Sequence, residues 1–318
     1  MQPWRSFTKS INRIANISLR NKSTGGNVSE RYIPRRALLY VPGNDERKIA
    51  KVQKIDVDCV VLDCEDGVAI NQKDAARETI RKVLGNTEFT RRTDVAVRIN
   101  SVDSGLAEDD LKCVLSAQKL PQTLLLPKVE DKNHVSWLVE RLGDTKFQII
   151  LYVESALGLV NLRDILEHGT KICRLAGLVF GSDDFTASIG ATRTKDAKEV
   201  LMARQQVVLL AKAYKLQAID MVHINFKDEE GLRVQALEGA QMGFTGKQVI
   251  HPAQVPIVQQ AFTPSAEQLD WASRLLAHFD VHQREGKGAF TFEGAMIDMP
   301  TVLQARNLVQ AYRAVQEE

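Results

Sequence analysis

The sequence has no apolar run near the roughly 18 residues that a membrane-spanning helix requires, so we expect a soluble protein without a membrane partner. It also lacks paired cysteines, because none of its four cysteines belongs to a CxxC motif. Zinc sites and disulfide frameworks depend on such clusters, so the sequence predicts neither. We interpret Cys59, Cys64, Cys113 and Cys173 as separate thiols in a reducing compartment.

Acidic residues are missing from residues 1–29, which contain the basic residues Arg5, Lys9, Arg13, Arg20 and Lys22. An acid-free leader with scattered apolar residues is typical of a mitochondrial transit peptide, although a plain disordered tail has a similar composition. We predict a transit-like leader over residues 1–29 and a location in the mitochondrial matrix. The other residues hold 37 of the 42 Lys and Arg against 40 Asp and Glu, so no basic excess indicates binding to nucleic acid.

No GxGxxG motif follows the first predicted strand, which weighs against a doubly wound dinucleotide-binding sheet. Instead, short apolar runs alternate with helical patterns. The runs are almost continuously apolar, as strands buried on both faces should be. The runs are Ala37–Val41, Cys59–Leu62, Val95–Ile99, Thr123–Leu126, Gln148–Val153, Leu178–Phe180, Ala218–Ile224 and Lys247–Ile250. Eight strand–helix units predict an α/β fold, a (β/α)8 TIM barrel over residues 33–262, with an open sheet as the alternative.

Polar residues follow the predicted strands. In a barrel the carboxyl ends of all strands meet on one face, where the active sites of this fold lie. The residues concerned include Asp45, Glu65, Asp66, Arg98, Asn100, Lys128, Glu154, Asp183, Asp184, His223 and His251. We therefore predict an active site at this face, although Asn44, Asp66 and Ser155 could each be a helix cap.

Glu154 stands directly after the run Gln148–Val153. A carboxylate at the end of a buried strand is costly unless something pairs with it. A hard cation is one such partner. The structural alternative is that Glu154 accepts hydrogen bonds from the start of the following helix, which Ser155 can cap.

The pattern changes after Phe262. Residues 265–283 predict an amphipathic helix with Ser265 and Gln268 as a capping box, and a final helix ends the chain. The Gly286-Lys287-Gly288 connector between them does not match a phosphate-binding P-loop. Residues 263–318 therefore form an extension outside the eight strand–helix units.

Taken together, the motifs resemble a known family. In chain order they are LLYVPGND, VLDCEDGV, VRIN, LPKVE, YVESALG, FGSDDFTASIG, GKQVIHP and GAFTFEGAMIDMP, and they resemble the citrate lyase beta subunit / malyl-CoA lyase family, the HpcH/HpaI aldolases. The resemblance implies a (β/α)8 barrel with a C-terminal helical lid over residues 263–318, Mg²⁺ as cofactor and self-association as a homotrimer. It also implies that a C–C bond is made or broken between a 2-oxo acid and the acetyl group of an acyl-CoA.

The resemblance also implies residue roles. Glu154 and Asp184 would bind the Mg²⁺. Arg98 would stabilise negative charge that develops on oxygen, a role that suits a permanently charged guanidinium. Glu65 and Asp66 would hold metal-bound water and Arg98 from a second layer, and a purely structural pair between Arg98 and one of these carboxylates stays open.

Further residues are expected to contact the substrate. Arg47 and Lys51 are four residues apart on one helix face, and we expect them to bind CoA phosphates, with a solvated helix face as the alternative. Tyr40 would line the same cleft, and Ile250 and His251 match another substrate-contacting position.

Asp298 is the remaining catalytic candidate. By resemblance it is the acid/base that exchanges the proton at the acetyl carbon, delivered by the lid of a neighbouring subunit. Its apolar neighbours Met296, Ile297 and Met299 would raise its pKa when the lid closes.

The expected reaction is Mg²⁺-dependent cleavage of (3S)-citramalyl-CoA to acetyl-CoA and pyruvate by a retro-Claisen step. One alternative is a malyl-CoA thioesterase or a malate-synthase-like activity on glyoxylate and acetyl-CoA. A non-catalytic scaffold subunit of a lyase complex is another. The sequence leaves the preferred 2-oxo acid open, because small differences between pockets shift selectivity only modestly.

Overall fold

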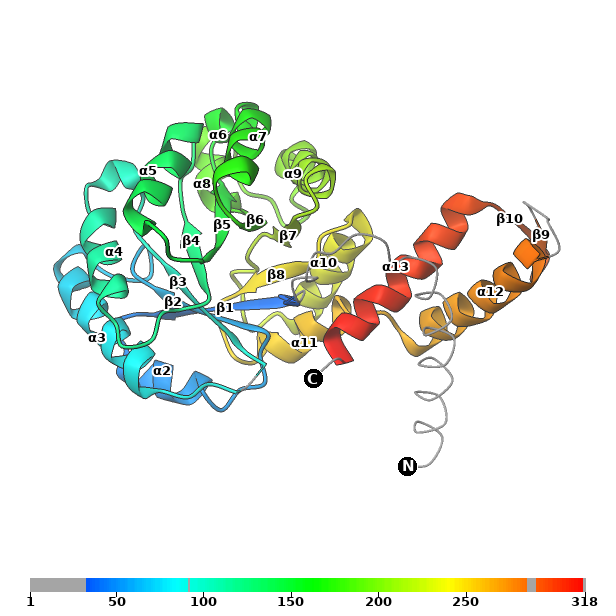
Figure 1. Ribbon diagram of the computed structural model, residues 1–318, viewed down its shortest axis with the longest axis horizontal. Coiled ribbons are helices and arrows are strands. Elements are labelled where there is room, and N and C mark those ends of the chain that lie inside the picture. The colour runs from blue at the N-terminus through cyan, green and yellow to red at the C-terminus, as the bar shows by residue number, and fades with distance from the viewer. Residues whose placement is uncertain (1–32, 91, 285–289, 317–318) are drawn as a thin grey trace. The chain divides into compact units, whose positions relative to one another are not determined.

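The computed structural model describes residues 33–90, 92–284 and 290–316 (Figure 1). The chain divides into two compact units, one formed by Arg35–Phe262 and the other holding Thr263–Glu318. The predicted leader over residues 1–29 lies outside the described residues. Within the described ranges, no helix is both long enough and apolar enough to cross a membrane.

Eight parallel strands close into a barrel in the order of the sequence, so the predicted (β/α)8 barrel is confirmed (Figure 1). The ring closes between the first and last strands, where Ala37 pairs with Lys247. The strands are β1 (Ala37–Pro42), β2 (Cys59–Asp63), β3 (Asp94–Arg98), β4 (Thr123–Leu126), β5 (Gln148–Val153), β6 (Leu175–Phe180), β7 (Gln217–Asp220) and β8 (Gly246–Val249).

The strands are buried on both faces, which explains their nearly continuous apolar sequences. Along each strand, alternate side chains point into the barrel or toward the helices. Leu38, Val61, Leu125 and Ile150 belong to the cluster that fills the interior, whereas their neighbours in sequence belong to the larger core under the helices. The packed interior leaves the polar strand ends to form the functional face.

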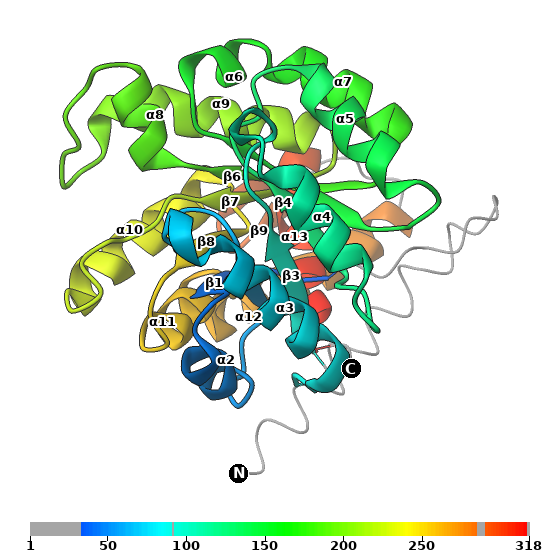
Figure 2. The same ribbon diagram turned by 90° about the vertical axis from the view of Figure 1, so that its left-hand side faces the viewer.

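Helices surround the barrel (Figures 1 and 2). They are α2 (Glu46–Val52), α3 (Lys73–Asn86), α4 (Ala107–Leu115), α5 (Lys132–Leu142), α6 (Ala156–Val160), α7 (Leu162–Ile172), α8 (Ser182–Ser188), α9 (Leu201–Ala213), α10 (Glu229–Met242) and α11 (Gln254–Ala261), with 3-10 turns at Ile70–Gln72, Val102–Ser104 and Lys198–Val200. The longer helices bury an apolar face at the 3.6-residue period, such as Ala76, Ile80 and Leu84 of α3.

The run Ala218–Ile224 differs from the prediction, because β7 ends at Asp220. Pairing with β6 stops at Ile219 and pairing with β8 stops at Asp220, so the described residues provide no ladder partner beyond this point. The run stays apolar because Met221 is buried and Val222 lines a pocket.

A buried polar network closes the amino ends of the strands. Arg35 donates from Nε to Asp94 Oδ2 at 2.6 Å and from Nη2 to Thr123 Oγ1 at 3.0 Å. The same Nη2 donates to Gln148 Oε1 at 2.9 Å, so one arginine spans from β1 to β5 across the barrel. This network is the barrel floor, and it lies opposite the polar carboxyl ends.

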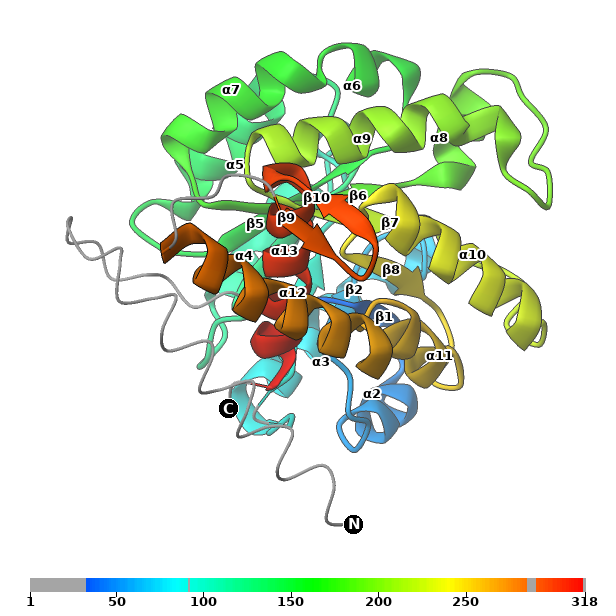
Figure 3. The same cartoon turned by 90° about the vertical axis from the view of Figure 1, so that its right-hand side faces the viewer.

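The second unit is a helical hairpin with its own core. It contains α12 (Ala266–Arg284), β9 (Phe290–Phe292), β10 (Ala295–Ile297) and α13 (Met299–Gln316), and Figure 3 shows the two short strands as a hairpin between the helices. The predicted capping box is confirmed, because Ser265 Oγ accepts the N–H of Gln268 at 3.1 Å and Gln268 Oε1 accepts the N–H of Ser265 at 2.9 Å. The core residues include Leu275, Phe279, Phe290 and Val302.

Candidate functional site

A pocket of about 580 Å³ opens at the carboxyl ends of the barrel strands. The predicted site residues that line it are Tyr40, Lys51, Asp66, Arg98, Glu154, Asp184, Ile250 and His251. The barrel therefore brings together residues that are more than two hundred positions apart in the sequence, as the convergence of strand ends predicts. Their chemical roles stay predictions.

Glu154 lies directly after β5 and is 5 % exposed. Its Oε1 accepts a short hydrogen bond from the main-chain N–H of Lys128. Ser155, not Glu154, caps α6, because its Oγ accepts the N–H of Gly158 at 3.0 Å. The alternative of Glu154 as an acceptor at a helix start is therefore wrong, and its carboxylate faces the pocket instead.

Burial is the main reason why the pKa of the Glu154 carboxyl is raised from 4.5 to about 8. The negative charges of Glu65 and Asp184 raise the pKa further, whereas the N–H of Lys128 and the charge of Arg98 lower it. A carboxylate held in this way gains from a nearby cation, because a cation favours its charged form.

Gly181 leaves the room that Glu154 occupies. A Cβ at this position would lie 2.5 Å from Glu154 Oε2 and 2.6 Å from its Cβ, which is closer than atoms can pack. A side chain here would therefore displace the carboxylate.

Asp184 lies in the first turn of α8, half-buried at the pocket wall. Its charge acts on both Glu154 and Lys128. The described residues contain no group of three or more His, Cys, Asp or Glu side chains arranged to hold a metal. Two carboxylates suit Mg²⁺ nevertheless, because this ion takes one or two carboxylates and completes its shell with waters and substrate oxygens.

Arg98 is held by carboxylates from β2 and the loop after it. It donates to Asp63 from Nε and Nη2, both at 2.7 Å, in a two-point pair. Its Nη1 lies 2.8 Å from Glu65 Oε2 and 3.7 Å from Asp66 Oδ2. The predicted pairing with Glu65 and Asp66 is present, but the principal partner is Asp63, which we did not predict to pair with Arg98.

These pairs fix charge at the site. Burial would raise the pKa of Asp63, but the Arg98 guanidinium and the main-chain N–H groups of Glu65 and Gly67 outweigh it and hold the pKa below its ordinary value. Burial raises the pKa of Glu65, although Arg98 and Lys128 oppose the rise. The guanidinium thus stays charged although it is buried, because these carboxylates raise its pKa.

Two tyrosines support Arg98 from inside the barrel. The guanidinium carbon lies 5.1 Å from the ring centre of Tyr40 and 5.7 Å from that of Tyr152. The two hydroxyl groups form a hydrogen bond with each other, and burial raises the pKa of both. Tyr152 was missed by sequence reasoning, although its place two residues before Glu154 puts it on the same face of β5.

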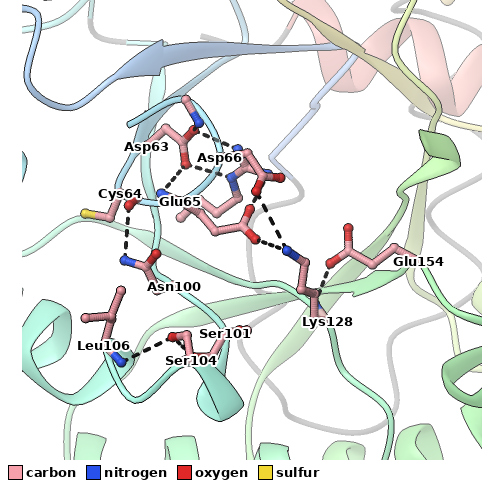
Figure 4. A network of polar contacts seen from close by, with 12 residues as sticks. Asp63, Cys64, Glu65, Asp66, Asn100, Ser101, Ser104, Leu106, Lys128 and Glu154 are labelled. Atoms are coloured by element: carbon pink, nitrogen blue, oxygen red, sulfur yellow. Dashed lines mark hydrogen bonds and ion pairs between the residues drawn. The ribbon is translucent and has the colours of Figure 1, made fainter. Parts of the chain in front are cut away.

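Lys128 is a second residue that sequence reasoning left without a role. Its ammonium lies 2.9 Å from Glu65 Oε1 and 3.7 Å from Asp66 Oδ1, and its N–H binds Glu154 (Figure 4). Its backbone has a φ of 52°, which is uncommon for a residue other than glycine. Its position after β4, beside the other polar strand ends, was the available signal.

The basic residues of α2 are placed unevenly. Lys48 and Lys51 line the pocket, whereas Arg47 is exposed and does not. The predicted contact of Arg47 with CoA phosphates therefore remains a prediction that concerns ligand atoms outside the pocket.

Glu65 is buried behind Arg98, outside the lining.

Asp298 belongs to the second unit, where it caps α13. Its Oδ1 accepts the N–H of Thr301 at 3.1 Å and its hydroxyl at 2.9 Å, and these hydrogen bonds lower the pKa of Asp298. Ile297 is buried, but Met296 and Met299 are exposed. The predicted rise in pKa would therefore need a further apolar surface to cover Asp298.

Comparisons with known proteins agree with this architecture. The chain is 50 % identical over 303 residues to the mitochondrial citramalyl-CoA lyase of Rattus norvegicus, covering 91 % of this chain and 89 % of that protein. It is 32 % identical over 282 residues to the (3S)-malyl-CoA thioesterase of Cereibacter sphaeroides, covering 89 % of this chain and 96 % of that protein.

A solved structure has the same fold and similar sequence. Protein CitE from Mycobacterium tuberculosis, in complex with magnesium, acetoacetate and coenzyme A, superposes with a TM-score of 0.73 at 32 % identity, covering 88 % of this chain and 98 % of that chain. The profile of the HpcH/HpaI aldolase/citrate lyase family matches residues 36–252. The chain therefore belongs to the HpcH/HpaI aldolase/citrate lyase family.

Proposed function

We propose that the protein is a carbon–carbon lyase that splits (3S)-citramalyl-CoA into acetyl-CoA and pyruvate with Mg²⁺ as cofactor. The observation that carries the proposal is one pocket that combines a buried carboxylate suited to a cation, Glu154, with a fixed guanidinium, Arg98. Identity of 50 % to a citramalyl-CoA lyase supports the choice of substrate.

The reaction needs three operations on the substrate. The hydroxyl group loses its proton to water. The bond between the hydroxyl-bearing carbon and the acetyl carbon then breaks, and its electron pair passes to the acetyl group as an enolate. A proton is then added at the acetyl carbon, which gives acetyl-CoA beside pyruvate. A bound Mg²⁺ would neutralise the carboxylate of the 2-oxo acid and polarise its carbonyl.

Glu154 and Asp184 are the residues that would hold the Mg²⁺. Glu154 is anchored by the N–H of Lys128, and Asp184 by its place in the first turn of α8. Substrate oxygens and waters would complete the shell, as this ion prefers.

Arg98 would stabilise the negative charge that develops on oxygen. Its guanidinium is fixed by Asp63 and Glu65, so it need not reorganise when the charge appears. Such preorganised charge is often the largest single contribution to catalysis. Lys51, Tyr40, Ile250 and His251 line the pocket and would contact the CoA thioester.

Asp298 would deliver the proton to the acetyl carbon. It lies directly before α13, between the exposed side chains of Met296 in β10 and Met299 in α13. Covering by the barrel of another subunit would remove it from water, raise its pKa and make it an effective acid at neutral pH. We include in the proposal that residues 263–318 act as a lid shared between the subunits of a homotrimer.

The decisive experiment is product analysis with citramalyl-CoA, malyl-CoA and citryl-CoA side by side, with and without Mg²⁺. We expect acetyl-CoA and pyruvate from citramalyl-CoA in the presence of Mg²⁺. Inactivity toward all three thioesters would refute the lyase proposal and favour a scaffold protein.

The second candidate is a thioesterase, which the identity of 32 % to a malyl-CoA thioesterase favours. Hydrolysis would release free CoA and leave the carbon skeleton intact. A thiol assay that detects free CoA, with no acetyl-CoA in the products, would favour this function over C–C cleavage.

The role of Asp298 is tested by subunit mixing. Asp298→Asn should abolish cleavage but still bind the CoA thioester. Mixing it with Arg98→Ala subunits should restore part of the activity, because a mixed oligomer combines an intact lid with an intact barrel. Absence of recovery in oligomers verified to be mixed would contradict a shared lid.

The location is proposed as mitochondrial, which the name of the R. norvegicus lyase and the basic, acid-free leader support. Deletion of residues 1–29 should redirect a fluorescent fusion of the full chain from mitochondria to the cytosol.

A further inference from the structure

Six carboxylates crowd the mouth of the barrel: Asp63, Glu65, Asp66, Glu154, Asp183 and Asp184. A divalent cation attracts every carboxylate within reach, so something must decide which of them bind it. Asp63 is already committed to Arg98 by two hydrogen bonds of 2.7 Å, and Asp183 accepts a hydrogen bond from Arg193. The question therefore concerns Glu65 and Asp66 on one side and Glu154 and Asp184 on the other.

Lys128 lies between Glu65 and Asp66 on one side and Glu154 on the other (Figure 4). Its ammonium is 2.9 Å from Glu65 Oε1 and 3.7 Å from Asp66 Oδ1. Its main-chain N–H holds Oε1 of Glu154. A single residue thus contacts both sides, through its side chain and its backbone respectively.

The backbone of Lys128 is what allows this double contact. A φ of 52° puts the residue in the left-handed region, which costs free energy for any residue with a Cβ. Glycine would relieve that cost, but it has no ammonium group. The presence of lysine at this position is therefore explained by its side chain and not by the turn.

We propose that Lys128 is a positioning residue that keeps Glu65 and Asp66 bound to its ammonium group, so that Glu154 and Asp184 are the carboxylates left for the cation. The contact with Glu65 is the stronger one, because Glu65 is 5 % exposed and Asp66 is 58 % exposed. This inference rests on the proposed function, since it assumes that Mg²⁺ binds in the pocket.

The consequence is a preference between cations. Mg²⁺ needs one or two carboxylates, whereas Ca²⁺ gathers six to eight oxygen ligands in a flexible shell. If the ammonium group is removed, Oε1 of Glu65 and Oδ1 of Asp66, the oxygens that do not face Arg98, become available as additional ligands. Ca²⁺ then gains more than Mg²⁺ does.

The test measures cation binding to the full chain after removal of metal with a chelator. Mn²⁺ is followed by electron paramagnetic resonance, and Mg²⁺ or Ca²⁺ is added to displace it. For Lys128→Met we expect the affinity for Ca²⁺ relative to Mg²⁺ to rise about tenfold or more, the range seen when residues behind metal ligands are changed. Lys128→Arg should stay within about threefold of the wild type, because it keeps the charge.

Lys215 provides a matched control. It is also a lysine at positive φ (59°), and it precedes β7 at the opposite end of the barrel. Lys215→Met should leave the Ca²⁺/Mg²⁺ ratio unchanged. The double variant Lys128→Met with Glu65→Gln should return the ratio toward the wild-type value, because the released carboxylate is gone.

An unchanged ratio in Lys128→Met would overturn the proposal. An equal loss of affinity for both cations together with a lower melting temperature would also overturn it, because this result is expected if Lys128 only stabilises the fold. Failure of both Lys128→Met and Lys128→Gln to fold, with Lys215→Met intact, would also refute it. A wild-type protein that binds Mn²⁺ but does not cleave citramalyl-CoA would refute the proposed function and leave this test valid.

Discussion

Glu154 makes the stability of the metal-free protein depend on pH. Burial raises the pKa of its carboxyl from 4.5 to about 8 in the folded chain. The raised pKa contributes fully to the free energy of unfolding below pH 4.5, where the carboxyl is neutral in both the folded and the unfolded chain. This contribution is lost as the pH rises toward 8. In this interval the unfolded chain releases the proton while the folded chain keeps it.

The magnitude follows from the difference between the two pKa values. Each pH unit in the interval costs about 1.4 kcal/mol, so about 4 kcal/mol has been lost at pH 7.5. Glu154→Gln removes this cost and still offers an oxygen to the N–H of Lys128. At about 2–4 °C per kcal/mol for a domain of this size, the metal-free variant should melt about 8–16 °C above the wild type at pH 7.5.

The assay is thermal unfolding of the full chain in chelator, followed by circular dichroism at about pH 5 and pH 7.5. The difference between Glu154→Gln and the wild type should grow with pH, and Mg²⁺ should stabilise only the wild type, because binding to the folded state adds to stability. Glu140→Gln, an exposed glutamate of α5, is the control for loss of one carboxylate. A difference that is equal at both pH values would refute the reasoning.

Three further predictions concern neighbouring residues. Asp63→Asn breaks the buried two-point pair with Arg98 and should cost about 3–5 kcal/mol in urea unfolding and lower kcat by about two orders of magnitude or more. Gly181→Ala pushes against Glu154 and should raise the half-saturating Mg²⁺ concentration about 10–100-fold in initial-rate assays. Lys51→Met removes a cation from the pocket wall and should raise KM for the CoA thioester about tenfold, less so at high salt, while kcat stays close to the wild-type value.

Each of these has a distinct contradicting result. Asp63→Asn with wild-type kcat would mean that the pair does not orient Arg98. For Gly181→Ala, an unchanged Mg²⁺ requirement would show that Glu154 does not bind the ion. A loss of kcat in Lys51→Met with unchanged KM would place that lysine in the chemical step instead of in binding.

The fold could be predicted because its signals are local. Strands buried on both faces have nearly continuous apolar sequences, and eight of them separated by helical patterns leave few alternatives to a barrel. The end of β7 could not be predicted, because a strand ends where the neighbouring strands stop pairing with it. Val222 is apolar for another reason, since it faces the pocket.

The location of the site could be predicted from the sequence more readily than the contacts within it. The convergence of strand ends predicted that Glu154 and Asp184 would share a face. The choice of Asp63 over Glu65 as the principal partner of Arg98 depends on the register of β2 and β3, which sets Asp63 directly beside Arg98. Sequence alone does not determine register, and the double contact of Lys128 depends on one unusual φ angle.

The barrel floor has a consequence for the order of events. Arg35 and its partners Asp94, Thr123 and Gln148 close the amino ends of the strands, so molecules reach Glu154 from the carboxyl face. A small 2-oxo acid bound at Glu154 would lie beneath the larger thioester that fills the mouth. Acetyl-CoA must then depart first and pyruvate second. Because the last product leaves the free enzyme that the substrate binds, pyruvate should be a competitive inhibitor with respect to the substrate. Acetyl-CoA should not be a competitive inhibitor.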